Sequence, residues 1–89
     1  MVITKEMYNE LIADCQMSIK DLKVRKKKNY MDMGKAIIMS RVMREMSNAA
    51  EIAKYEREIQ TCERNEQLID DNISKEESVL ECLVKRLSE

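Results

Sequence analysis

The residues with the widest chemical repertoire in this chain of 89 residues are three cysteines, Cys15, Cys62 and Cys82. A cysteine metal site needs a close pair of thiols or a nearby histidine. These three cysteines lie far apart in the sequence, and histidine is absent. Each of them falls within an apolar helical pattern, which is typical of small buried residues in a reducing compartment. We therefore expect no metal site and no cofactor.

Motifs for phosphate binding and for acid–base catalysis are also missing. The only glycine, Gly34, precedes a lysine, but a phosphate-binding loop also needs glycine at position 29 and Ser or Thr at position 36, where Asn29 and Ala36 stand. Acidic neighbours such as Asp70 and Asp71 project to different sides of a helix. General acid–base catalysis needs such groups to converge in an apolar cleft. We expect that the protein is not an enzyme.

The net charge of −1 conceals three zones of different sign. Residues 1–19 carry −2, residues 20–44 carry +7 from nine bases and two acids, and residues 45–89 carry −6 from six bases and twelve acids. A basic zone beside an acidic one can attract a charged partner or a second copy. The bases that could bind an anion or a nucleic acid are Lys23, Arg25, Lys26, Lys27, Lys28, Arg41 and Arg44.

The composition predicts an all-α fold. Proline, phenylalanine and tryptophan are absent and glycine occurs once, so the usual turn residues and large core aromatics are lacking. Sheet folds need several turns and are close to excluded. No apolar stretch approaches the roughly 18 residues that span a bilayer. No basic segment followed by an apolar one marks a secretory signal. We expect a cytoplasmic protein with no membrane association.

The first helix is predicted over about residues 4–28, with Thr4 as its N-cap. Its apolar positions advance by steps of four and three residues and form a narrow stripe: Tyr8, Ile12, Cys15, Ile19 and Leu22. The basic run before Asn29 favours a helix end, which places a turn near residues 29–32. Nothing between residues 25 and 35 strictly breaks a helix, so one continuous helix through this region is the alternative.

Two further helices are predicted, a long one over about residues 33–71 and a short one over about residues 75–88. The long helix narrows to a stripe that advances by threes and fours, with Glu66 at the one skipped position: Ile52, Tyr55, Ile59, Cys62, Ile69 and Ile73. Residues 70–72 are poor helix formers, and Ser74 to Glu77 has the spacing of a capping box. These elements predict a single helical domain over residues 1–89.

The predicted architecture is an antiparallel helical hairpin or a three-helix arrangement around one long central helix. We expect oligomerisation to complete it, and a dimer is favoured. Two helices cannot enclose the broad apolar face of the long helix, so self-association is expected. The candidate oligomer interface consists of Ala36, Met39, Met43, Met46, Ala50 and Ala53. A charge at Met43 is expected to dissociate or unfold such an oligomer.

The functional hypothesis is a non-enzymatic protein-binding module, such as an adaptor, a chaperone or an inhibitor, which acts through an oligomeric helical surface. The surplus apolar helix face, the charge zones and the lack of catalytic motifs support it. The alternative is a nucleic-acid or nucleotide binder that uses the basic zone from Lys20 to Arg44, where phosphate neutralisation needs only lysine and arginine.

Overall fold

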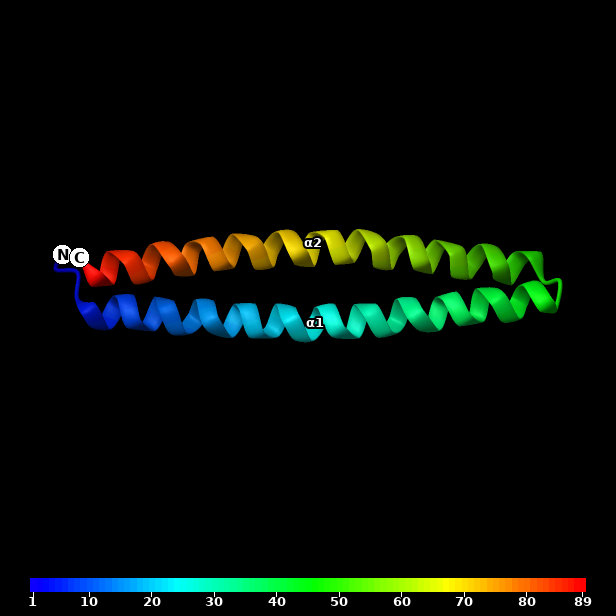
Figure 1. Cartoon of the computed structure of the whole chain (residues 1–89), viewed down its shortest axis with the longest axis horizontal. Helices are drawn as coiled ribbons and strands as arrows, with labels where there is room; N and C mark the ends of the chain where they lie inside the picture. The colour runs from blue at the N-terminus through cyan, green and yellow to red at the C-terminus, as the bar shows by residue number, and fades with distance from the viewer.

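The computed structural model, which describes all residues 1–89, is an antiparallel hairpin of two long helices (Figure 1). Helix α1 spans Lys5–Glu45 and helix α2 spans Ala49–Ser88. The molecule measures 67 × 19 × 14 Å, and both termini lie at the same end (Figure 1). The all-α prediction and the hairpin are therefore confirmed, whereas a three-helix arrangement is not observed.

The two helices pack along one seam on each helix, with residues repeating every three and four positions as in a coiled coil. In α1 the seam residues are Tyr8, Ile12, Cys15, Ile19, Leu22, Lys26, Asn29, Met33, Ala36, Ser40 and Met43. In α2 they are Ile52, Tyr55, Ile59, Cys62, Glu66, Ile69, Ile73, Glu76, Leu80, Leu83 and Leu87. All of them except Lys26 are buried or half-buried.

The core of this hairpin is thin because each helix has only one neighbour. Only Cys15, Ala36, Ser40 and Cys62 are buried, and all four are small seam residues. The larger seam residues remain half-exposed at the edges of the contact. Small side chains at the centre of the seam let two helices approach closely, whereas two helices alone cannot enclose large ones.

The predicted turn at residues 29–32 is wrong, and the alternative of one continuous helix through this region is confirmed. Asn29 does not end a helix; it occupies a seam position, and its side-chain nitrogen donates a hydrogen bond to the Cys62 carbonyl oxygen at 2.8 Å. One turn earlier, the Lys26 ammonium lies 2.7 Å from the Asp70 carboxylate. The apolar repeat of α1 is interrupted here because two seam positions are occupied by polar residues, and both of these residues bind polar groups of α2.

The predicted break between a long and a short helix at residues 72–74 is also wrong, since α2 continues to Ser88. Ser74 does not cap a helix: its carbonyl oxygen accepts a hydrogen bond from the Ser78 hydroxyl, as in a helix interior. Glu76 fills the seam position between Ile73 and Leu80. The S-x-x-E spacing is therefore coincidental here.

The chain reverses at Met46, Ser47 and Asn48. The Ser47 and Asn48 amides donate to the last carbonyls of α1, those of Arg44 and Met43. Ser47 has a φ of 56°, the left-handed conformation that commonly follows a helix. The Asn48 side chain then accepts a hydrogen bond from the Glu51 amide at 3.2 Å and caps α2.

Substitutions at Ser47 and Asn29 test where the chain turns. Ser47→Gly should raise the free energy of unfolding by about 1 kcal/mol, because glycine adopts a positive φ without a steric penalty. Ser47→Val should lower it. Asn29→Gly should destabilise the hairpin by at least about 1 kcal/mol, because glycine weakens a helix interior and the bond to Cys62 is lost. Urea denaturation followed by circular dichroism measures all three. Stabilisation by Asn29→Gly would contradict this turn position.

Candidate interaction surface

The outer face of α1, which points away from α2, carries an apolar residue every seventh position. Met17, Val24, Met31 and Ile38 make up this outer stripe, and each is between 59% and 62% exposed. A spacing of seven residues keeps side chains on one side of a helix that winds as half of a coiled coil. The outer stripe therefore lies directly opposite the seam.

Cations flank the outer stripe on both sides. One row contains Lys20, Lys27 and Arg41, and the other contains Asp14, Asp21, Lys28 and Lys35. None of the five cations takes part in the ion pairs of the structure, which join Lys26 to Asp70, Arg44 to Glu56 and Lys54 to Glu51. Together with the two acids, these cations leave the outer face of α1 with a net positive charge.

The outer face of α2 is polar at the corresponding positions. Its heptad positions opposite the seam are occupied by Arg57, Arg64, Asp71, Ser78 and Lys85. The two helices therefore differ in how their apolar residues are distributed. Helix α2 is apolar on one side only, whereas α1 has apolar residues on opposite sides and almost no net amphipathicity.

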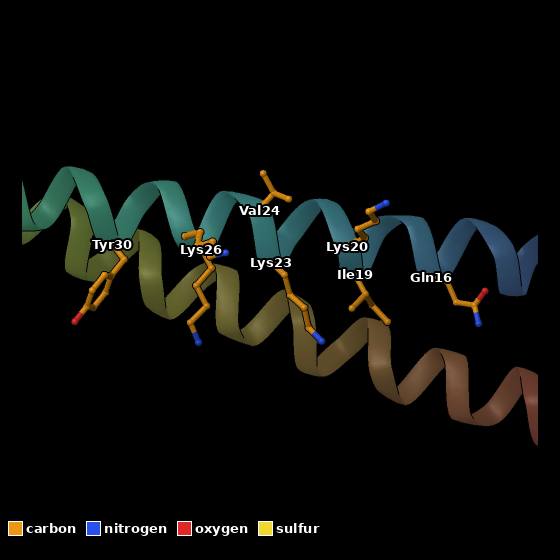
Figure 2. Close-up of a pocket in the computed structure, with 8 residues that line it drawn as sticks. Gln16, Ile19, Lys20, Lys23, Val24, Lys26 and Tyr30 are labelled. Atoms are coloured by element: carbon orange, nitrogen blue, oxygen red, sulfur yellow. The ribbon is translucent and has the colours of Figure 1, made fainter.

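An open groove of about 620 Å³ adjoins the outer stripe on one flank of α1 (Figure 2). Val24 of the outer stripe, Tyr30 and Ile19 supply its apolar lining. The side chain of Val24 points away from α2, whereas that of Lys23 extends towards it (Figure 2). The polar residues that line the groove are Gln16, Lys20, Lys23, Lys26 and Lys27.

The seven bases predicted to bind an anion do not converge on one site. Lys26 and Arg44 are engaged in ion pairs with α2. Lys23 and Lys27 line the groove of Figure 2. Arg25 and Lys28 line a different hollow, together with Asn65, Leu68 and Asn72 of α2, and Arg41 is exposed near the end of α1.

The six residues of the predicted oligomer interface do not form one helix face, because the chain turns in their midst. Ala36 is buried and Met43 half-buried in the seam of α1, so α2 covers the positions assigned to a second copy. Met39 is half-buried beside Tyr55. Met46 lies exposed in the turn, and the remaining two residues belong to α2: Ala50 and Ala53.

The two buried cysteines lie in polar surroundings at the seam. The Cys15 sulfur lies 3.1 Å from the Glu76 carbonyl oxygen and 3.2 Å from its carboxylate. Burial, and then the hydrogen bond with Glu76, raise the pKa of the Cys15 thiol. Burial also raises the pKa of Cys62, and the charges of Asp32 and Glu58 add to this effect.

These surroundings give the cysteines no catalytic or metal-binding character. Raised pKa values disfavour the reactive thiolate. No group of cysteine and acidic side chains in the structure could hold a metal ion. Cys82 is exposed and, like the other two, forms no disulfide.

The fold defines the class of this protein as an antiparallel two-helix coiled coil. Neither helix contains a segment that is both long and apolar enough to cross a bilayer. Comparison with protein-family models, with curated proteins and with solved structures gave no match.

The outer stripe is a surface feature that the sequence analysis missed. The broad apolar spread after residue 33 was attributed to one face of a long central helix. The correct signal is present in the sequence: once the seam of α1 is extended through Lys26 and Asn29, four of the exposed apolar residues fall seven apart on the opposite side, whereas others, such as Leu11 and Tyr30, do not.

Cysteine ionisation should make the hairpin less stable at alkaline pH. Because the folded-state pKa of Cys15 and of Cys62 is raised, their protonated thiols stabilise the fold below the ordinary thiol pKa of about 8.5. This contribution is lost as the pH rises through the raised folded-state values. The Cys15→Ala/Cys62→Ala variant should therefore lose less stability than the wild type between pH 7 and pH 10, measured by urea denaturation.

The exposed Cys82 supplies the matched control, and Cys82→Ala should keep the wild-type loss. The ion pair with Asp70 raises the pKa of Lys26, so its contribution is also lost at alkaline pH. That effect is common to all the variants and cancels in the comparison. An equal loss in the wild type and in the double variant would contradict the described surroundings of the two thiols.

A charge at Met43 should now weaken the hairpin rather than an oligomer interface. Met43→Glu places a carboxylate in the half-buried seam and should lower the free energy of unfolding by about 1–3 kcal/mol. Met46→Glu, in the exposed turn, should change it by less than about 0.5 kcal/mol. Thermal denaturation measures stability, and light scattering measures mass. A Met43→Glu protein that stays folded but has half the wild-type mass would instead show that Met43 lies in an oligomer interface.

Proposed function

We propose that this protein is a non-enzymatic protein-binding module, an adaptor, chaperone or inhibitor, which acts through the outer face of α1. The single observation that carries this proposal is the outer stripe, whose four apolar residues share one heptad position and remain more than half exposed. The three free thiols support a reducing compartment, the cytoplasm, as its location.

The outer stripe plays no part in closing the hairpin. The contact between the helices uses the seam, which lies on the opposite side of α1. Exposed apolar residues are normal on protein surfaces when they occur singly. Four in succession at one heptad position, with polar residues at the matching positions of α2, form a patterned surface of the kind that marks an interaction site.

The size of this surface suits contact with another macromolecule. Met17 and Ile38 are separated by roughly 31 Å along the helix axis at the usual helical rise. Full burial of an aliphatic or methionine side chain contributes roughly 1.5–3 kcal/mol. Four such side chains in a row can anchor a partner along six turns of α1.

Nucleic-acid binding is the second candidate, and the groove of Figure 2 is the observation that favours it. Lys20, Lys23 and Lys27 could neutralise phosphates there, and Tyr30 could stack on a base. Acidic residues of α2 oppose this reading, because Asp70 lies against the same region of α1 and pairs with Lys26. We therefore rank a protein partner first.

Site-specific photo-crosslinking in cell extract tests the proposed function. A crosslinking residue at position 24, in the outer stripe, should yield discrete protein adducts. The same group at position 71, on the outer face of α2, should yield few. The adducts should persist after nuclease treatment and should disappear when Met17 and Met31 are both replaced by serine. Equal adducts from both positions would contradict a binding face on α1, and loss of adducts with nuclease would favour the second candidate.

A further inference from the structure

We propose that the outer stripe of α1 binds an acidic amphipathic helix of a partner protein. This inference rests on the proposed function and specifies the chemistry of the partner. It depends on two separate observations, the seven-residue spacing of the apolar residues and the unpaired cations on both sides of them.

The spacing favours a helix as the occupant. Apolar residues that recur every seven positions on a helix of a coiled coil present a continuous line to a second helix of the same repeat. Between Val24 and Met31, the next residues on this face are Lys27 and Lys28. At least one lysine lies in each interval between successive apolar residues, and Asp21 is the one acid among them. A partner helix that presents apolar residues beside carboxylates would match both.

The flanking cations determine the charge that the partner helix must carry. The two rows beside the outer stripe occupy the places that flanking charged residues take in a coiled coil, where they select partners by electrostatic complementarity. Lys20 and Lys27 stand on one side, and Lys28 and Lys35 on the other. The carboxylates of α2 leave all four without an ion pair. Glutamate or aspartate beside the apolar residues of the partner would supply the missing counter-charges.

A second copy of this chain does not meet these requirements. If the outer stripes of two copies packed together, two faces of net positive charge would be brought into contact, and Asp14 and Asp21 would offset only part of the repulsion. The outer face of α2 offers no apolar line to receive α1, since it presents residues such as Arg64, Asp71 and Ser78. The net positive charge of this face therefore favours a different, acidic protein as the partner.

A bilayer and a nucleic acid fit less well. Helices that lie on membranes present a broad apolar face, usually with leucine or large aromatic residues, whereas the outer stripe is one residue wide and is interrupted by lysines. A phosphate backbone would use the cations but would leave the outer stripe exposed. The experiment described next distinguishes a bilayer and a nucleic acid from a protein helix.

The experiment measures binding of two synthetic helical peptides to the full chain by fluorescence anisotropy. Each peptide has four heptads, with leucine and alanine on one stripe. The acidic peptide carries glutamate at the flanking positions, and its twin carries lysine there. We expect the acidic peptide to bind at least about tenfold more tightly than the basic twin, and to bind more weakly as salt is raised.

Matched variants locate the contact on α1. Val24→Ser/Met31→Ser should weaken binding of the acidic peptide by at least about tenfold, because two apolar contacts are lost. Asp71→Ser, at the equivalent outer position of α2, should leave it within about twofold. Lys20→Glu/Lys27→Glu should reverse the preference towards the basic twin. All these residues are exposed, and circular dichroism verifies that each variant keeps the hairpin.

Several results would overturn the proposal. Equal binding of both peptides, or equal loss with Asp71→Ser, would show that the charge pattern or the face is wrong. Binding to phosphatidylserine vesicles or to duplex DNA, without binding to the acidic peptide, would replace the helix by those occupants. A dimer that Val24→Ser/Met31→Ser dissociates would assign the face to a second copy. Protein adducts from position 24 without acidic-peptide binding would leave the proposed function standing and refute this partner chemistry alone.

Discussion

The structure depends on a single interhelical seam, because each helix of a two-helix hairpin can bury only one side of itself. Every other feature follows from this constraint. The buried residues are the small ones at the centre of the seam, Cys15, Ala36, Ser40 and Cys62. Apolar residues placed anywhere else must remain in contact with solvent or with a partner. In α2 most of the large aliphatic residues lie in the seam, and the exceptions are Leu68, Val79 and Val84, whereas in α1 a second set lies outside it in a line opposite the seam.

Polar groups within the seam explain how the two helices keep one register. A purely apolar seam permits neighbouring alignments that differ little in energy, whereas a polar seam residue is satisfied in one alignment. Asn29 donates to the Cys62 carbonyl, and the Lys26 ammonium pairs with Asp70. Near the termini, the Cys15 thiol meets Glu76. These contacts, together with the turn at Ser47, hold α1 and α2 in their observed alignment.

The sequence predicted the all-α fold and most of the seam, but the chain was divided into three helices and the turn was misplaced. The stripes from Tyr8 to Leu22 and from Ile52 to Ile73 are those observed. The error arose at Lys26 and Asn29, which occupy seam positions. The sequence of α1 alone does not show that these polar residues have partners on α2. The true turn at Ser47 has neither glycine nor proline, so local composition marked it only weakly.

The candidate interaction surface could be predicted only after the register was known. Helix α1 has apolar residues on two opposite sides, and their contributions to amphipathicity nearly cancel. In the sequence, the apolar residues of this helix are therefore spread around its axis with no single apolar face. This spread suggested an interface made of Ala36, Met43 and their neighbours. Once the seam accounts for those two residues, four of the remaining exposed apolar residues, Met17, Val24, Met31 and Ile38, fall on one line. Because this line lies opposite the seam, α1 holds α2 on one side and leaves a second set of apolar residues exposed on the other.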